Sequence, residues 1–409
     1  MLIVAPLSIL GVWKEEFQKF AAFPYSLVVL TGTSTKKLDT IRHMVGTALQ
    51  VAVVNYESAW RMEKDLTAWK PDLIIADEGH KIKTHNIAAS KALHRMGAKA
   101  CYRLLLTGTV ITNKAIDVFS QYKFLNPSIY GNSFYAFRNR YFDMTGYGNH
   151  TPVLKKAMEP ELTAKLHSIS YRATKAECLD LPDTTDVLRQ VDLEPQALRI
   201  YRGLVKESYA ELAGGEVTAT NVLTRLLRLS QLTGGFIGND ETAAVEQVSA
   251  AKLAALEDIL DGAMAEGKKL VIIARFIPEI QAICKLLEKR GLRYSCITGE
   301  VKNRSEQVEH FQNNPDVMAF VGQIATAGLG ITLTAASTMV FYSLDYSMSN
   351  YEQTKARIHR VGQRMPCTYL HLVAKGTVDE KVLRALRDKA SLAKTLVDDY
   401  RNGRNPFAE

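Results

Sequence analysis

Several features that mark membrane and secreted proteins are missing from the sequence. No apolar run approaches the roughly 18 residues that a membrane-spanning helix needs, and the apolar start lacks the basic region and cleavage site of a signal peptide. The five cysteines are scattered, with no paired spacing for a metal and an odd number for disulfides. No repeat or low-complexity tract is present. We therefore expect a protein of the reducing cytosol with no membrane partner.

The composition is that of a large globular protein with an excess of basic residues. Its 409 residues are 47% hydrophobic, which suits two domains or lobes better than a single core. The formal net charge is +8. This balance favours a polyanionic partner such as a nucleic acid, but a merely basic enzyme is about as consistent with charge alone.

Short apolar runs alternate with helical patterns in two blocks, which is typical of parallel strands connected by helices. The first block contains four expected strands, at residues 2–5, 51–54, 73–76 and 104–106. The second contains five, at residues 270–273, 294–297, 318–321, 339–342 and 369–373. The predicted fold class is α/β, with two lobes built on parallel sheets.

Between the blocks, the strand pattern gives way to long helical patterns. The stretch "NVLTRLLRLSQL" places five apolar residues on one helical face: Val222, Leu223, Leu226, Leu227 and Leu229. The polar "GNDET" at 238–242 is the expected hinge into the second lobe. We expect four parts: a first lobe at 1–118, a helical insertion at 119–238, a second lobe at 239–376, and a C-terminal helix and tail at 377–409.

An acidic pair follows one expected buried strand. The sequence "DLIIA" runs into "DEGH", which places Asp77 and Glu78 at the carboxyl end of that strand, where parallel α/β sheets bind ligands. In a nucleoside triphosphatase such an Asp holds Mg²⁺, usually through water, and the Glu polarises the attacking water. An isolated Asp-Glu is more often a solvated pair without a function, so the neighbouring segments decide between the two interpretations.

Two further strand ends offer groups suited to nucleotide chemistry, although each alone is common. The sequence "RLLLTGTVITN" breaks from a strand at Thr107 and Thr109, whose hydroxyls could relay nucleotide state to another site. The sequence "GQIATAGLGITLTAAS" places Gly328 and Gly330 after a strand, where backbone amides can bind phosphate.

The segment "QTKARIHRVGQ" carries two cations. Arg357 and Arg360 are three residues apart, which puts them on one face if the segment is helical. Two such guanidinium groups could reach a transferring phosphate as arginine fingers do. A solvated basic helix is the alternative.

In this order along the chain, these segments resemble the motifs of the Swi/Snf family of superfamily-two helicase-like ATPases. The matching segments, from motif Ia to motif VI, are "LIVAPLSILGVWKEEF", "VVNYE", "DEGH", "LLLTGTVITN", "VIIARF", "ATAGLGITL" and "QTKARIHRVGQ". The "HRVGQ" form of motif VI is especially specific, and the similarity spans nearly the whole chain. It implies two RecA-like lobes separated by the family's helical insertion, with ATP and Mg²⁺ bound between the lobes and a helix after motif VI that braces both.

The resemblance also implies roles for individual residues. Asp77 would hold Mg²⁺, Glu78 would activate water, and Arg357 and Arg360 would be the arginine fingers. Six residues would couple nucleotide state to DNA: His80, Thr107, Thr109, Gly328, Gly330 and Gln363. Five would contact double-stranded DNA, in such enzymes mostly through phosphate: Pro6, Ser8, Tyr56, Lys81 and Thr326.

The implied function is ATP-driven translocation along double-stranded DNA. Strand-separating members of the superfamily lack the helical insertion, so translocation or remodelling is favoured over unwinding. Two alternatives stay open: a strand-separating DNA or RNA helicase, and a DNA-binding remnant or subunit that hydrolyses no ATP. The lack of chromatin-reading or zinc modules points to a bacterial enzyme, or a phage enzyme in a bacterial cytoplasm.

One family motif is missing. No G-x-x-x-x-G-K-[ST] phosphate loop occurs in the sequence, and in the family this loop precedes motif Ia. We therefore expect a first lobe that is incomplete at its N-terminus and lacks a central strand beside the one ending in Asp77, and a chain that is inactive alone. Three explanations are open: an incomplete copy of a longer protein, a split gene whose partner chain supplies the loop, or a degenerate module. The first two are favoured because all four predicted catalytic residues remain in register.

Overall fold

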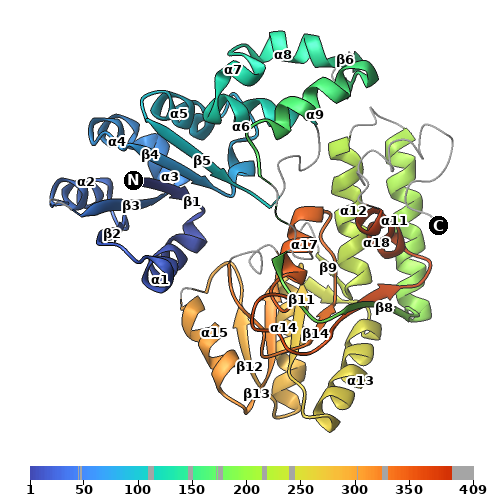
Figure 1. Ribbon diagram of the computed structural model, residues 1–409. Coiled ribbons are helices and arrows are strands. Elements are labelled where there is room, and N and C mark those ends of the chain that lie inside the picture. Colours follow the sequence, from blue (N-terminus) through green and yellow to red (C-terminus); the bar gives the residue numbers. More distant parts are fainter. Residues whose placement is uncertain are drawn as a thin grey trace. The chain divides into compact units, whose positions relative to one another are not determined.

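The computed structural model describes residues 1–44, 46, 48–108, 115–145, 151–171, 173, 178–213, 219–238, 245–301, 303–324 and 330–388. The chain divides into two units, Met1–Ala173 and Thr174–Glu409 (Figure 1). Three predicted site residues, Thr109, Thr326 and Gly328, lie outside the described residues. Among the residues described, no helix combines the length and apolar character needed to cross a membrane.

The first unit is built on a five-stranded parallel sheet of order β2-β3-β1-β4-β5. Its strands are β1 (Leu2–Ala5), β2 (Tyr25–Val29), β3 (Leu49–Asn55), β4 (Leu73–Asp77) and β5 (Tyr102–Leu106). Its connecting helices are α1 (Leu10–Phe20), α2 (Ser34–Arg42), α3 (Tyr56–Arg61), α4 (Glu63–Ala68) and α5 (Ala88–Gly97) (Figure 1). All four predicted strands are confirmed, and β2 is an additional edge strand.

The central strand β1 has both faces covered. Leu2 and Val4 pack into one hydrophobic core with α3 to α5, whereas Ile3 and Ala5 pack into a second core with α1. All four side chains are completely buried. Burial on both faces explains why this strand is apolar at every position, since no residue of it faces water.

Strand β4 has a neighbour on each side. It pairs with β1 through Ile74–Ala76 and with β5 through its whole length, with Asp77 opposite Leu106. The prediction of a missing strand beside β4 is therefore wrong, because both of its edges are already hydrogen-bonded. The sheet edge nearest to Asp77 is the outer edge of β5, which pairs with no second strand among the described residues.

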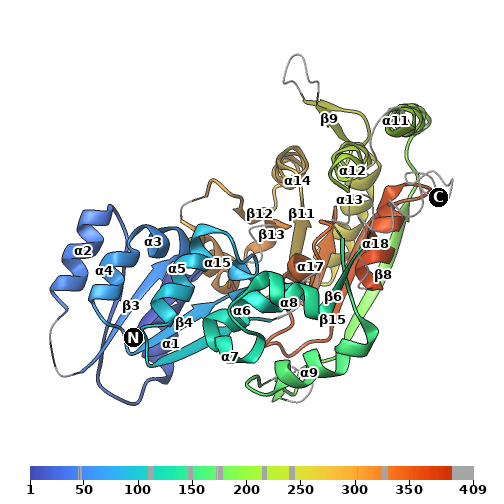
Figure 2. The same ribbon diagram turned by 90° about the horizontal axis from the view of Figure 1, so that it is seen from above.

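A helical subdomain completes the first unit. It contains α6 (Val118–Leu125), α7 (Pro127–Tyr130), α8 (Phe134–Tyr141), the hairpin of β6 (Phe142–Thr145) and β7 (Thr151–Leu154), and α9 (Glu159–His167). Figures 1 and 2 show this group beside α5 and β5. Its core is largely aromatic, with buried Phe119, Tyr122, Tyr130, Phe137 and Tyr141. The chain from Thr174 onward belongs to the second unit, and the bounds of the insertion at 119–238 stay a prediction.

The second unit contains a six-stranded parallel sheet of order β12-β13-β11-β14-β15-β8. Its strands are β8 (Thr184–Val191), β11 (Leu270–Ala274), β12 (Arg293–Ile297), β13 (Val317–Gln323), β14 (Thr338–Phe341) and β15 (Cys367–Ala374). A hairpin of β9 (Phe236–Gly238) and β10 (Val245–Gln247) flanks the predicted hinge, whose residues 239–242 lie outside the described residues. All five predicted strands are confirmed, and β8 adds an edge strand.

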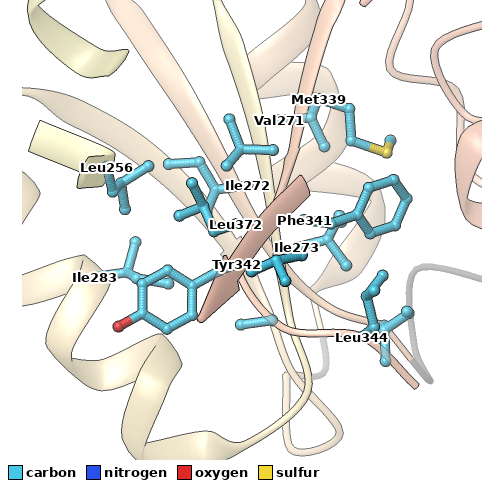
Figure 3. Close-up of a cluster of buried hydrophobic side chains, with 14 of the residues drawn as sticks. Leu256, Val271, Ile272, Ile273, Ile283, Met339, Phe341, Tyr342, Leu344 and Leu372 are labelled. Carbon is cyan, nitrogen blue, oxygen red and sulfur yellow. The ribbon is translucent and has the colours of Figure 1, made fainter. Parts of the chain in front are cut away.

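Helices surround this second sheet. They are α11 (Pro195–Ala213), α12 (Ala219–Thr233), α13 (Ala251–Ala265), α14 (Ile277–Lys289), α15 (Arg304–Asn313), α17 (Met348–Lys355) and α18 (Val378–Arg387). Figure 3 shows Ile272 of β11 and Leu372 of β15 meeting Leu256 of α13 in the core. In α12, the predicted apolar face is confirmed by the complete burial of Val222, Leu226 and Leu229.

Candidate active site

Three predicted segments meet at the carboxyl edge of the first sheet. Asp77 is the last residue of β4, and Glu78 follows it. The pairing of Val4 with Ala76 and of Leu106 with Asp77 places Pro6 and Thr107, the residues beyond β1 and β5, at the same edge. This is the edge where parallel α/β sheets bind their ligands.

The Asp77 carboxylate is fixed by two hydrogen bonds. The indole Nε1 of Trp13, on α1, donates to Oδ2 at 3.0 Å, and the backbone N–H of Glu78 donates to Oδ1 at 2.8 Å. Burial raises the pKa of Asp77, while these two hydrogen bonds act in the opposite direction. The sequence analysis did not identify Trp13 as a site residue. The only feature that could have indicated it is the position of a tryptophan in the helix that follows β1.

The turn after Asp77 is conformationally special. Glu78 has φ 52° and ψ 52°, a left-handed conformation that few non-glycine residues adopt and that is common at functional sites. Its Oε2 lies 3.1 Å from Nδ1 of His80, the predicted coupling residue. At Gly79 a Cβ would lie 2.3 Å from the side chain of Leu105 on β5, so any larger residue here would have to displace Leu105. The "DEGH" sequence therefore forms a tight turn directly after β4.

The predicted DNA contacts of the first unit differ in exposure. Tyr56 is only 4% exposed, and its hydroxyl donates to the Asp77 carbonyl at 2.7 Å. This hydrogen bond holds the end of β4 in place. Lys81 is exposed, and Pro6 starts a turn in which its carbonyl accepts from the N–H of Ile9. The side chain of Ser8 lies outside the described part of the chain. DNA contact by these residues stays a prediction.

Asp77 fits a magnesium ion that arrives with a nucleotide. No group of three His, Cys, Asp or Glu side chains able to hold a metal occurs among the described residues. Mg²⁺ needs only one or two protein carboxylates when phosphates and waters complete its shell. Each Asp77 oxygen accepts one of the two hydrogen bonds above, which leaves lone pairs for a water of the Mg²⁺ shell.

The two predicted arginine fingers lie in the second unit, just beyond α17. This helix ends at Lys355, so Arg357 and Arg360 lie in the following turns and not on a helical face. The backbone of Arg357 accepts from the N–H of Leu333 at 2.9 Å, and Nη1 of Arg360 donates to the Ile331 carbonyl at 3.4 Å. The arginine segment is thereby attached to the chain that follows Gly330, whose φ of 58° favours glycine.

Gln363 holds this arginine segment in place. Its side chain is 7% exposed, and Nε2 donates to the carbonyls of Ala336 at 2.9 Å and Ile358 at 3.1 Å. Its Oε1 accepts from the backbone N–H groups of Arg364 and Met365. These contacts give Gln363 a positioning role; the predicted coupling to nucleotide state is untested.

A first α/β unit whose β4 ends in paired carboxylates, followed by a second with a turn of two arginines, is the architecture of the helicase-like ATPases. The family model described as the SNF2-related domain matches residues 1–234, and the helicase conserved C-terminal domain matches residues 251–362. The chain therefore belongs to the SNF2-related, or Swi/Snf, family, as its motifs predicted.

Curated relatives are similar along nearly all of this chain. The DNA repair and recombination protein RDH54 of Saccharomyces cerevisiae (strain JAY291) is 28% identical, with 98% of this chain and 46% of that protein covered. An uncharacterized ATP-dependent helicase of Mycoplasma pneumoniae is 27% identical, with 97% of this chain and 37% of that protein covered. This chain thus spans less than half of the length of either relative. Among solved structures, the Sulfolobus solfataricus SWI2/SNF2 ATPase core in complex with dsDNA is 26% identical, with 99% of this chain and 82% of that chain covered and a TM-score of 0.44.

Proposed function

We propose that this chain is the motor core of an ATP-dependent double-stranded DNA translocase or remodeller. Asp77 binds Mg²⁺ together with the nucleotide phosphates, Glu78 polarises the attacking water, and Arg357 and Arg360 stabilise the charge of the transferring phosphoryl group. The observation that carries the proposal is the Asp77 carboxylate, held at the carboxyl end of β4 by Trp13 and by the amide of Glu78.

Coupling between nucleotide and DNA is proposed for two sets of residues. The coupling set is His80, Thr107, Thr109, Gly328, Gly330 and Gln363. The DNA-contacting set is Pro6, Ser8, Tyr56, Lys81 and Thr326. Support comes from the sheet edge that Pro6 and Thr107 share with Asp77, and from the contact of His80 with Glu78. A DNA substrate accords with the net charge of +8 and with the name of the yeast relative, a DNA repair and recombination protein.

The phosphate loop is proposed to come from sequence outside these 409 residues or from a partner chain, so that the chain alone hydrolyses no ATP. The outer edge of β5 is the best place for the strand that leads into such a loop, because it is the open sheet edge nearest to Asp77. Tyr102 and Leu104 of β5 are 70% and 44% exposed, which is unusual for apolar side chains of a parallel sheet. A strand and helix added there would cover them.

The compartment proposed is the cytoplasm of a bacterium, which includes a phage-infected one. All five cysteines lie in the described part of the chain and are free thiols, as expected in a reducing compartment. The Mycoplasma relative gives a bacterial precedent for the family.

The test is a DNA-stimulated ATPase assay on the complete native protein or the complex with its partner. Glu78→Gln should abolish turnover and preserve nucleotide binding, whereas Glu16→Gln, an exposed change on α1, should leave both turnover and nucleotide binding unchanged. Arg357→Ala or Arg360→Ala should lower the rate by roughly 10³-fold or more. Full ATPase activity in the Glu78→Gln protein would overturn the proposal.

Two further assays separate the rival functions. Displacement of a third strand from a triplex without separation of the duplex supports translocation, whereas displacement of a strand from a forked duplex identifies a strand-separating helicase. Salt-sensitive duplex binding that ATP leaves unchanged identifies a binding subunit that does not hydrolyse ATP.

A further inference from the structure

The edge strand β8 contacts the part of the second unit that carries the two predicted arginine fingers. It pairs in parallel with β15, and seven of its eight side chains are exposed. Burial of apolar surface therefore contributes little to hold β8 in place. Its polar groups, and the chain just before it, instead make specific contacts with α17 and with the arginine segment that follows this helix.

Asp186 of β8 forms an ion pair with Lys355, the last residue of α17. The ammonium Nζ lies 2.9 Å from Oδ1 and 2.8 Å from Oδ2, so it donates to both carboxylate oxygens. It also lies 4.3 Å from the centroid of the Tyr369 ring on β15. The Lys355 side chain is 17% exposed, so salt screens this pair less than a pair on the open surface. The end of α17 is thereby fixed two positions before Arg357.

Tyr351, four positions earlier on α17, contacts the same carboxylate. Its hydroxyl donates to Oδ1 of Asp186 at 3.4 Å. The hydroxyl oxygen also lies 2.9 Å from Nε2 of the buried His371 on β15, from which it can accept a second hydrogen bond. Residues four apart lie on one face of a helix, so Asp186 contacts two successive turns of α17.

A second contact reaches the arginine segment itself. Nε2 of His359 lies 2.9 Å from the carbonyl oxygen of Pro182, two residues before β8 begins. A carbonyl oxygen can only accept, so Nε2 carries the proton and donates it. Lys355 and His359 flank Arg357 in the sequence, and His359 directly precedes Arg360. One short stretch of chain thus contacts the residues on both sides of Arg357.

We propose that the chain from Pro182 to Asp186 positions Arg357 and Arg360 for the chemical step. This inference rests on the proposed function, in which the two guanidinium groups stabilise charge on the transferring phosphoryl group. Such groups act only when they are aimed at the place where charge develops, and a displacement of about 1 Å can lower the rate roughly 10²-fold. Asp186 is thus a positioning residue that acts through Lys355.

A merely structural ion pair would behave differently. Pairs that are partly exposed to solvent contribute little to stability, and loss of such a pair has no reason to change the chemical step. A positioning role predicts a lower kcat, with an unchanged KM for ATP and an unchanged denaturation midpoint. The split between kcat and KM therefore distinguishes the two roles.

The first measurement is the DNA-stimulated ATPase rate of the complete native protein or of the complex with its partner. Asp186→Asn removes the charge at constant size and should lower kcat roughly 10- to 100-fold, with KM for ATP unchanged. Lys355→Gln should do the same, and the double variant should lose no more than either single variant, because both act through one contact. The control is Asp258→Asn, which breaks the exposed ion pair between Arg189 of β8 and Asp258 of α13 and should keep the wild-type rate.

The second measurement needs no ATPase activity and uses the 409-residue chain. The backbone N–H groups of Arg357, His359 and Gln363 donate to carbonyls three or four positions earlier. In Asp186→Asn these groups should exchange with deuterium about tenfold faster than in the wild type, whereas those of β11 should exchange at the same rate.

Two results would overturn the inference: unchanged exchange in the arginine segment of Asp186→Asn, or a kcat of Asp186→Asn equal to that of Asp258→Asn. A complete wild-type protein without ATPase activity would instead overturn the proposed function. The exchange measurement would then still decide whether β8 holds the arginine segment in place.

Discussion

The indole N–H of Trp13 donates a hydrogen bond of 3.0 Å to the carboxylate of Asp77, across 64 positions of sequence. This bond connects the first helix of the chain to the end of β4. It counteracts the rise in the pKa of Asp77 that burial causes, and so favours the ionised form that a magnesium site requires.

Trp13→Phe should therefore weaken the site while keeping most of the packing. Loss of a hydrogen bond to a charged group costs about 1.5–3 kcal/mol, which predicts a roughly 10- to 100-fold lower DNA-stimulated ATPase rate in the complete protein. Because the pKa of Asp77 rises further, the acid limb of the pH–rate profile should move to higher pH. Trp60→Phe, a change at a partly exposed tryptophan, is the control; equal effects of both variants would refute the role of Trp13.

Gly79→Ala should destabilise the first unit through steric overlap alone. Its Cβ would lie 2.3 Å from Leu105, and overpacking of this kind costs about 1–3 kcal/mol. Urea unfolding measures the loss, and a second change, Leu105→Ala, should partly relieve it. Gly11→Ala, on α1 with no atom within 4 Å of the added carbon, should be neutral or stabilising. Equal stability of the Gly79→Ala protein and the wild type would show that the turn can move.

Gln363→Ala should loosen the arginine segment. The change leaves the carbonyls of Ala336 and Ile358 without their donor in a buried site, at a cost of about 1–3 kcal/mol. We expect a lower denaturation midpoint of the second unit and, in the complete protein, a lower ATPase rate at unchanged nucleotide affinity. Val361→Ala, at a side chain 64% exposed, is the control. An unchanged midpoint in Gln363→Ala would contradict the positioning role.

Glu279 should make the stability of the second unit depend on pH. Its side chain is completely buried, and burial raises its pKa from 4.5 to about 7. The folded chain then holds a proton that the unfolded chain releases, so the free energy of unfolding falls as pH rises from about 4.5 to about 7. The full effect is about 3 kcal/mol.

Urea unfolding of the wild type and of Glu279→Gln at several pH values tests this expectation. The variant cannot ionise, so the wild type should lose stability relative to the variant as pH rises through this range, with no further change above it. A difference between the two proteins that stays constant from pH 4.5 to pH 8 would show that Glu279 is already ionised at the lower limit.

The buried strands were predictable, but two of the four edge strands, β2 and β8, were not. Leu2–Ala5 and Leu270–Ala274 lie between two neighbours with both faces covered, so their sequences are continuously apolar. Strand β8 is exposed at nearly every position, so its sequence carries no comparable pattern, whereas β2 has an apolar run but is only partly buried. An edge strand is defined by the neighbour it pairs with, which local sequence does not reveal.

In the candidate site, too, residues marked by their neighbours in the sequence were predictable, and residues placed by tertiary packing were not. Asp77 and Glu78 were predictable because strand and carboxylates are adjacent in the sequence. Trp13 was not, because tertiary packing alone brings its side chain to Asp77. The burial of Tyr56 was not predicted for a related reason. Tyr56 begins α3, and its contact with the end of β4 depends on packing between segments that are distant in sequence.

The open edge of β5 also bears on how the protein is made. No further strand of the described structure pairs with this edge, so its backbone groups and the exposed Tyr102 and Leu104 can accept a strand from any chain nearby, which includes a second copy of this one. During synthesis, other nascent copies therefore compete for this edge with the strand that we propose to cover it. Overproduction of this chain alone favours the copies, so inclusion bodies and self-seeded aggregates are the expected outcome, and co-expression with a chain that carries the proposed strand should reduce them.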